Sequence, residues 1–393
     1  MTTQRILFVC TNQSSFVKED LAILREKYSV TVLQISSKSR VSQFFSLLRQ
    51  LIFLTFNIHR FSLVYIWFAD YHSFLPILFC RILNKPSYIV AGGYDVCRIK
   101  KVGYGSFVNP VRGFMTKYSF THCTRCLCVS AHVERVVRAI APTAKTELVY
   151  NGISRFFTSE SAYNQGFPIL VELSGRTSHY SKKKRGVLCV ASASSAQGIY
   201  IKGIDRYITA ARLNPELSFA LVGCAREVLE KHLVSEEKPG EQGGLGEQGG
   251  HDGPDGHDWP GKHSETVELK EKWPGLLPVN LILFPRLEQK DLKELYIRSK
   301  VYCQLSRSES FGVAMAEAMY YNCIPVYTAA GGLKEVAGEF GFMVSGKDPD
   351  EISTAIKRAY SIVEIPDSRE RIGSLFTYKQ RAEKLLAVIN QER

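Results

Sequence analysis

The sequence has little acidic charge in its first half. Residues 1–150 hold 19 lysines and arginines against 7 aspartates and glutamates, whereas residues 151–393 hold 31 of each kind. The net charge of +12 therefore lies in residues 1–150, which predicts an anionic partner there: a membrane surface, a lipid phosphate or an acidic glycan. Nucleic acid is not expected as a partner, because no motif of a nucleic-acid-binding module occurs.

The chain also lacks a long uncharged apolar run and an ordered cysteine framework. Residues 5–10 are too short for the apolar part of a signal peptide and fit a first strand. Residues 41–58 carry an apolar stripe at helical spacing that Arg49 interrupts, which makes a poor membrane span. The stripe predicts a helix packed on the core, and a helix lying in a membrane interface is the alternative. Ten scattered cysteines indicate a reducing cytoplasm, with peripheral attachment to the inner membrane face as an option.

No glycine occurs in the loop after the first predicted strand, residues 11–16. A dinucleotide-binding enzyme would carry its Gly-x-Gly-x-x-Gly motif at this place, so an NAD-dependent enzyme is not expected. Strands and helices nevertheless alternate along the chain, and its 393 residues are enough for two domains. The sequence therefore predicts an α/β protein with two parallel sheets.

Two stretches could suggest a metal site, and neither is favoured. One is a cluster in which His122 and Cys123 precede Cys-x-Cys, but it lacks the second ligand pair of a structural zinc site, and residues 125–130 fit a strand. The other is Asp348-Pro349-Asp350, which fits a helix start with Asp348 as N-cap. No metal is therefore expected.

The most informative stretch is residues 305–335, where apolar runs alternate with polar loops. Residues 301–305 suit a buried strand, and the apolar positions after the following loop recur at helical spacing, with Ser308 or Ser310 as N-cap. Pro325 ends that helix, a short strand follows, and two glycines allow a tight turn before another helix.

Glu309 and Glu317 lie eight positions apart in this stretch, one in the loop and one about two turns into the helix. About 12 Å of axial rise separates them, too far for two carboxylates that flank one glycosidic bond. The pair suits the two ends of one elongated polar ligand, with a diphosphate at the helix N-terminus between them.

The stretch resembles the Glu-x7-Glu signature of retaining glycosyltransferases of family 4, which have the GT-B fold of two Rossmann-like domains facing across a cleft. The resemblance covers nearly the whole chain apart from residues 235–275 and is stronger in the second half. It implies a nucleotide diphosphate sugar as donor, no cofactor and no metal. Glu309 would contact the donor sugar, Glu317 the ribose and Lys202 the diphosphate.

The resemblance also assigns residues to each side of the cleft. The donor and nucleotide side would comprise Lys202, Gly203, Glu309, Ser310, Phe311, Gly312, Val313, Glu317, Gly331 and Gly332. The acceptor side, at the carboxyl ends of strands, would comprise Ser14, Ser15, Asp70, Gly92 and Gly93. The candidate catalytic residues are Glu309, Lys202, His72 and Asp95. His72 or Asp95 would replace a family histidine where this chain has two glycines, although a structural or solvated role suits His72 equally. The family's arginine upstream of the lysine is also missing.

The expected organisation has four parts and one insertion. The parts are an acceptor-side domain (1–155), a linker (156–185), a nucleotide-sugar-binding domain (186–360) and a helical segment (361–393) whose last helix, 378–390, packs back on the first domain. The Gly-rich polar residues 235–275 are predicted to be a disordered insertion.

The predicted activity is a hexosyltransferase-type transfer, with retained configuration, to a glycan, a lipid-linked molecule or a small molecule. A nucleotide-sugar epimerase or phosphorylase on the same fold and a non-catalytic binding protein are the alternatives. Glu309→Ala is expected to abolish transfer with little loss of stability, because a loop carboxylate would pack against nothing.

Overall fold

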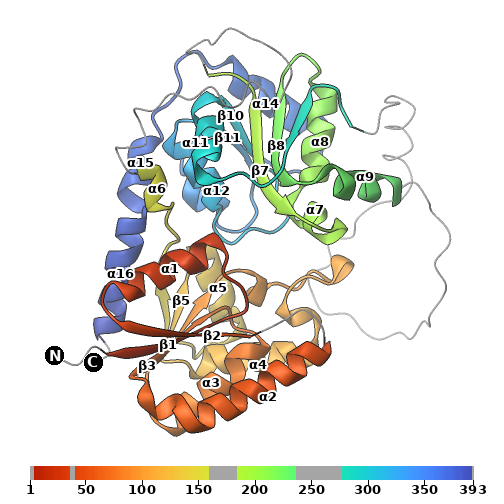
Figure 1. Cartoon of the computed structure of the whole chain (residues 1–393). Coiled ribbons are helices and arrows are strands. Elements are labelled where there is room, and N and C mark those ends of the chain that lie inside the picture. Colours follow the sequence, from red (N-terminus) through yellow and green to blue (C-terminus); the bar gives the residue numbers. More distant parts are fainter. Residues whose placement is uncertain (1–3, 36–39, 159–183, 236–276, 392–393) are drawn as a thin grey trace.

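A computed structural model describes residues 4–35, 40–158, 184–235 and 277–391. Most of the predicted linker (156–185) and insertion (235–275) lies outside these ranges. The described chain forms two six-stranded parallel sheets with flanking helices, which confirms the predicted α/β class with two Rossmann-like units. Figure 1 shows the N-terminal sheet below and the C-terminal sheet above, with α15 (Arg369–Leu375) and α16 (Tyr378–Gln391) along one side.

The N-terminal sheet has the order β2-β1-β3-β4-β5-β6. Its strands are β1 (Arg5–Cys10), β2 (Ser29–Gln34), β3 (Leu63–Trp67), β4 (Ser87–Ala91), β5 (Arg125–Cys128) and β6 (Thr146–Leu148). Its helices are α1 (Ser15–Arg25), α2 (Arg40–Asn57), α3 (Tyr71–Ile82), α4 (Pro110–His122) and α5 (Ala131–Ile140). The short α6 (Arg155–Thr158) follows β6 and packs against α11 (Gln289–Arg298) of the C-terminal unit. The central strands are continuous apolar runs because helices cover both faces of a parallel sheet.

The C-terminal sheet has the order β12-β11-β10-β7-β8-β9. Its strands are β7 (Val187–Ala193), β8 (Phe219–Cys224), β9 (Leu281–Phe284), β10 (Val301–Gln304), β11 (Ile324–Thr328) and β12 (Phe342–Val344). Its helices are α7 (Ala196–Lys202), α8 (Ile204–Leu213), α9 (Arg226–Ser235), α11 (Gln289–Arg298), α12 (Val313–Tyr320), α13 (Leu333–Ala337) and α14 (Pro349–Ser361). Loops at the carboxyl ends of both sets of strands face each other across the molecule, where open α/β sheets bind ligands.

A buried ion pair holds α16 against the N-terminal unit. Arg381 donates from Nε to Asp20 Oδ1 at 2.5 Å and from Nη2 to Oδ2 at 2.7 Å. The Tyr65 hydroxyl and the Trp67 indole donate to the same carboxylate at 2.6 and 2.8 Å. Both charges are almost fully buried, so the last helix completes the core of the first sheet.

The prediction that the apolar stripe of residues 41–58 packs on the core is wrong. Phe44 and Phe56 of α2 are 65% and 69% exposed, whereas Gln50 and Leu54 on the opposite face are fully buried. The helix therefore attaches through the face with fewer large apolar side chains. Within the ranges that the structure describes, no helix is both long enough and apolar enough to cross a membrane.

The basic run predicted to be a solvated linker, residues 182–185, is anchored at its end. Lys184 donates from Nζ to the carbonyl oxygens of Tyr296 and Ser299, each at 2.9 Å. Burial lowers the pKa of this ammonium group. Lys184 therefore fixes the point at which the chain enters β7.

Candidate active site

Lys202, predicted to contact the donor diphosphate, and Glu309, predicted to contact the donor sugar, form a direct ion pair. Lys202, the last residue of α7, donates from Nζ to Glu309 Oε2 at 2.9 Å. Gln304 Nε2 and the Ser306 hydroxyl donate to the same oxygen at 3.3 and 3.5 Å. The side chain of Glu309 is 12% exposed and that of Lys202 is 33% exposed. A fixed carboxylate thus lies beside a partly exposed cation.

Two glycines let the loops approach each other closely around this pair. Gly203, at a φ of +65°, would place a Cβ 1.9 Å from the carbonyl oxygen of Leu305. Gly331, at a φ of +61°, would place one 1.4 Å from the carbonyl oxygen of Glu309. No larger residue fits either position without moving the backbone. These two glycines, both predicted to bind the donor, therefore allow three loops to come into close contact at Glu309.

Helix α12 begins differently from the prediction. Gly312, at a φ of +96°, is its N-cap, and neither Ser308 nor Ser310 caps it with a side chain. The first backbone N–H groups of the helix, from Val313 onwards, can therefore donate hydrogen bonds to a bound anion. Phe311 is buried and packs edge-on against Phe376 with ring centroids 5.3 Å apart, so its side chain belongs to the core.

Glu317 points into an enclosed polar position beside α11. The Tyr296 hydroxyl donates to Glu317 Oε2 at 2.9 Å. Glu317 keeps some accessible surface, yet burial raises the pKa of its carboxyl group to about 8, against the lowering effect of the tyrosine hydrogen bond. The charge of Glu19 on α1 raises the pKa further. Burial thus favours the neutral form of the Glu317 carboxyl group.

Replacing Glu317 by glutamine is expected to flatten the pH dependence of stability. The pKa of Glu317 is 4.5 in its ordinary state and about 8 when folded. Between these values the folded protein holds a proton that the unfolded chain has lost. The free energy of unfolding therefore falls as pH rises through this window, by up to about 1.4 kcal/mol per pH unit.

Glutamine keeps the shape of the neutral carboxyl group but cannot titrate. Thermal unfolding of the wild type, of Glu317→Gln and of the exposed control Glu364→Gln, measured across this window, would test the assignment. The control should follow the wild type. Parallel curves for Glu317→Gln and the wild type would contradict the raised pKa.

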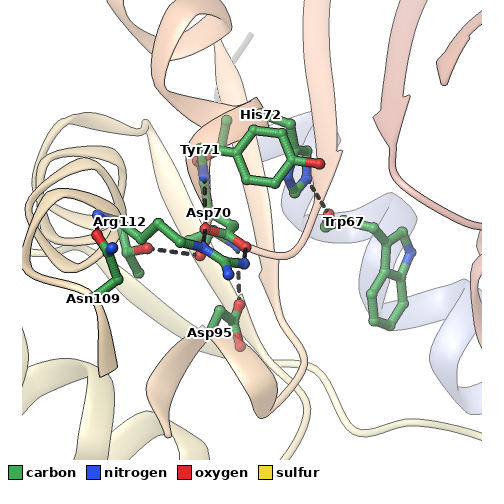
Figure 2. Close-up of polar contacts among 10 residues, drawn as sticks. Trp67, Asp70, Tyr71, His72, Asp95, Asn109 and Arg112 are labelled. Carbon is green, nitrogen blue, oxygen red and sulfur yellow. Dashed lines mark hydrogen bonds and ion pairs between the residues drawn. The ribbon is translucent and has the colours of Figure 1, made fainter. Parts of the chain in front are cut away.

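On the acceptor side, Asp95 joins the loops that follow β3 and β4. Its carboxylate accepts hydrogen bonds from the backbone N–H groups of Gly93, Ala69 and Gly92 at 2.8, 3.0 and 3.2 Å. The side chain is fully buried, and this burial raises its pKa to about 6. Figure 2 shows Asp95 below Asp70 and Arg112. The geometry supports a role in shaping the loops and does not support the predicted catalytic role.

The Asp70 carboxylate also makes its hydrogen bonds and its ion pair within the protein. It accepts from the backbone N–H of Tyr71 at 2.8 Å at the start of α3, and Arg112 Nε donates to it at 2.9 Å with a second bond from Nη2. The guanidinium of Arg112 lies over the rings of Tyr71 and Tyr94, 5.7 and 5.5 Å from their centroids. Arg112, which the sequence interpretation overlooked, is a partly exposed cation on this side (Figure 2).

His72 lies inside the N-terminal unit. Its Nε2 is 2.9 Å from the carbonyl oxygen of Trp67, and the residue is 1% exposed. Burial lowers the pKa of the imidazole. In Figure 2 the ring is directed toward Trp67, while Asp70 and Arg112 meet each other on another side. The structural alternative for this histidine therefore fits, and the geometry does not support the catalytic one.

The two predicted serines flank the start of α1. Ser14 occupies the N-cap position without a side-chain capping bond, and its buried hydroxyl oxygen has no hydrogen-bond partner within the described parts of the chain. Ser15 is exposed. Both lie at the carboxyl end of β1, as the predicted acceptor side requires, but neither contacts the ion pair of Lys202 and Glu309 in any recorded hydrogen bond.

The two units touch at several places across the cleft. Gly93, at a φ of +118°, would place a Cβ 2.6 Å from the Cβ of Ser310, so these loops touch. The Sγ of Cys97 lies 3.3 Å from the hydroxyl oxygen of Ser308. Glu335 accepts hydrogen bonds at 2.7 Å from each of two backbone N–H groups at the start of α5, those of Ala131 and His132. The structure is therefore closed over the predicted donor site.

Two of the clustered cysteines lie in a strand, as predicted for residues 125–130. Cys126 and Cys128 lie in β5 with their Sγ atoms 3.9 Å apart, and His122 contacts Arg81 at 3.1 Å. Asp348 caps α14 by accepting from the N–H of Asp350 at 2.9 Å, which confirms the capping interpretation. Among the residues with a described position, no three histidine, cysteine, aspartate or glutamate side chains are placed to hold a metal ion.

Solved structures share this architecture across the whole chain. Sucrose-phosphate synthase from Thermosynechococcus elongatus matches at 14% identity and a TM-score of 0.69, over 99% of this chain and 98% of that one. Anabaena HepE, solved in complex with UDP and glucose, matches at 13% identity and a TM-score of 0.65, over 98% and 99%. A putative UDP-N-acetylglucosamine 2-epimerase from Listeria monocytogenes matches at 12% identity and 0.59, over 100% and 97%. A search of curated protein sequences finds no match.

These likenesses and the two facing sheets define a protein of the GT-B fold. Residues 182–374 match the family described as "Glycosyl transferases group 1". These residues include the loops and helices that carry Lys202, Glu309 and Glu317. The C-terminal unit therefore belongs to this family of glycosyltransferases.

Proposed function

We propose that the chain transfers a sugar from a nucleotide diphosphate sugar to a glycan, lipid-linked or small-molecule acceptor in the cleft beside Glu309, without a metal ion. The contact between Lys202 and Glu309 carries this proposal, because it joins a diphosphate-binding cation to a sugar-binding carboxylate at one point. The predicted donor residues thus meet although they lie 107 positions apart.

The roles follow from the charges. The ammonium group of Lys202 and the N–H groups at the start of α12 would face the diphosphate, and both stabilise the negative charge that develops on it as it leaves. Glu309, oriented by Gln304 and Ser306, would accept hydrogen bonds from donor hydroxyl groups. Glu317 would accept from the ribose, opposite the Tyr296 hydroxyl.

The reaction breaks the bond between the anomeric carbon and the diphosphate oxygen and forms one from that carbon to the acceptor oxygen on the same face. The acceptor hydroxyl proton passes to the leaving phosphate oxygen. No step is assigned to His72 or Asp95, because both are buried and bonded to backbone groups. Positioning and electrostatic stabilisation supply the rate enhancement.

A thermal-shift screen against a panel of nucleotide diphosphate sugars, with a chelator present, tests donor binding. A donor at about 100 times its Kd should stabilise the wild type by about 2.7 kcal/mol, because it binds only the folded protein. Lys202→Ala should lose most of this shift. The exposed control Lys347→Ala should keep it.

Equal shifts for Lys202→Ala and the wild type would contradict the assigned diphosphate site. No shift with any donor would contradict donor binding at this site. For a donor that binds, product analysis then separates the activities. Transfer yields free nucleotide diphosphate and a glycosylated acceptor, an epimerase yields a different nucleotide sugar, and a binding protein yields neither.

A further inference from the structure

The outer face of α2 is apolar and exposed. Six large apolar side chains on it are each at least 40% exposed. They are Phe44, Phe45, Leu48, Leu51, Ile52 and Phe56, at a spacing that brings them to one side of the helix. A surface helix normally turns such a stripe inward. A continuous exposed apolar face on a folded protein marks an interaction surface.

This face continues onto the neighbouring helices. Helix α2 packs against α3, and α3 packs against α4. On α4, Val111 and Phe114 are 60% and 65% exposed, and Ile82 at the end of α3 is 70% exposed. Figure 1 shows the three helices together at the bottom of the N-terminal unit. We call this outer surface of α2, α3 and α4 the basal layer.

The charge of the basal layer has one sign. None of its three helices contains an aspartate or a glutamate, whereas they contain four arginines and one lysine. Arg49 and Lys117 are exposed. The closest carboxylate in the sequence, Asp70, is already paired with Arg112. Apolar side chains bordered only by cations complement a surface that is apolar inside and anionic outside.

We propose that the basal layer docks on the surface of a lipid bilayer that contains anionic lipids. The phenylalanine, leucine and isoleucine side chains enter the interface, and the basic side chains contact the headgroup phosphates. A second copy of the chain fits less well, because it would bring two acid-free basic surfaces together and like charges repel. The docking itself does not depend on the proposed transfer reaction.

Docking would also determine where the cleft lies relative to the bilayer. Helices α3 and α4 run side by side in the same direction, since Asp70 pairs with Arg112 at their starts and Arg81 contacts His122 at their ends. Both starts lie at the end of the sheet that lines the cleft. The cleft edge would therefore lie close to the bilayer, which, given the proposed function, favours an acceptor with a lipid anchor.

Flotation of the full-length protein with vesicles tests the docking without any activity measurement. The wild type should float with vesicles of phosphatidylcholine and phosphatidylglycerol and not with phosphatidylcholine alone. Raising the salt from about 0.1 M to about 1 M should weaken binding, because the screening length falls from about 10 Å to about 3 Å.

The triple variant Phe44→Ser, Phe45→Ser, Phe56→Ser should bind anionic vesicles more than about 100-fold less tightly, since each buried phenylalanine adds to membrane affinity. The matched control, Val279→Ser, Met343→Ser, Val363→Ser, changes exposed apolar residues of the C-terminal unit and should bind like the wild type. Because all six side chains are exposed, both variants should unfold at wild-type temperatures.

Three results would overturn the proposal. The wild type could fail to bind anionic vesicles, or the phenylalanine variant could bind them as well as the control. The third result would be a wild-type dimer in sedimentation that is absent in the phenylalanine variant. That result would assign the basal layer to an interface between two copies of the chain. Flotation without any sugar transfer would support the docking and contradict only the proposed reaction.

Discussion

Replacing Glu309 by glutamine is expected to lower the rate of sugar transfer by about 10²- to 10³-fold, the usual effect of losing one charged or hydrogen-bonding group that acts in a transition state. Glutamine has nearly the same shape, so Gln304 and Ser306 can still donate to its oxygen. The negative charge that pairs with Lys202 is lost.

The structure corrects the expectation that Glu309→Ala would leave stability unchanged. Its carboxylate is mostly buried and accepts three hydrogen bonds, so alanine would leave buried donors unpaired at a cost of about 1–3 kcal/mol. The glutamine variant is therefore the better test. Initial rates with a saturating donor, compared with those of the exposed control Glu364→Gln, measure the effect. A folded Glu309→Gln variant with wild-type rates would remove Glu309 from the mechanism.

Replacing Arg381 by leucine is expected to lower the free energy of unfolding by about 3–5 kcal/mol, because removal of one partner leaves the other charge buried and unpaired. Asp20 would keep only the hydrogen bonds from Tyr65 and Trp67. The carbonyl oxygens of Val149 and Tyr150 would also lose their donor, since Arg381 Nη1 lies 3.0 and 2.9 Å from them.

Urea unfolding followed by tryptophan fluorescence, to which Trp67 beside Asp20 contributes, measures this change. Lys379→Leu on the same helix is the control, since its side chain is 78% exposed. A double variant with Asp20→Asn should recover part of the loss, because no buried charge remains. Equal stability of Arg381→Leu and the wild type would show that α16 is held by its apolar contacts alone.

The sequence predicted those parts of the structure that depend on local spacing. Apolar runs and turn residues located the strands, and the pattern around Glu309 placed it in a loop and Glu317 in a helix. Periodicity could not show which way the stripe of α2 faces. An apolar stripe has the same spacing whether the helix turns it toward the core or toward solvent. The elements packed against the helix determine which of its faces is buried.

Contacts between distant residues were beyond sequence reasoning. Glu335 meets the start of α5 about 200 positions away, and Tyr296 meets Glu317 from another helix. Sequence reasoning left a structural and a catalytic role open for His72, because the contact of its ring with the Trp67 carbonyl oxygen depends on the folded structure. Arg112 was overlooked because its partners lie on other loops and give no local pattern.

The pairing of Asp20 with Arg381 has a consequence for how the protein is made. A ribosome delivers Asp20 early, and its partner follows 361 residues later. Until α16 is made, the surface of α1 that it covers stays open and the Asp20 carboxylate has no cation beside it. The first sheet therefore cannot reach its final packing without the last helix. The N-terminal unit is translated first, yet its packing is complete only after the last helix has been made.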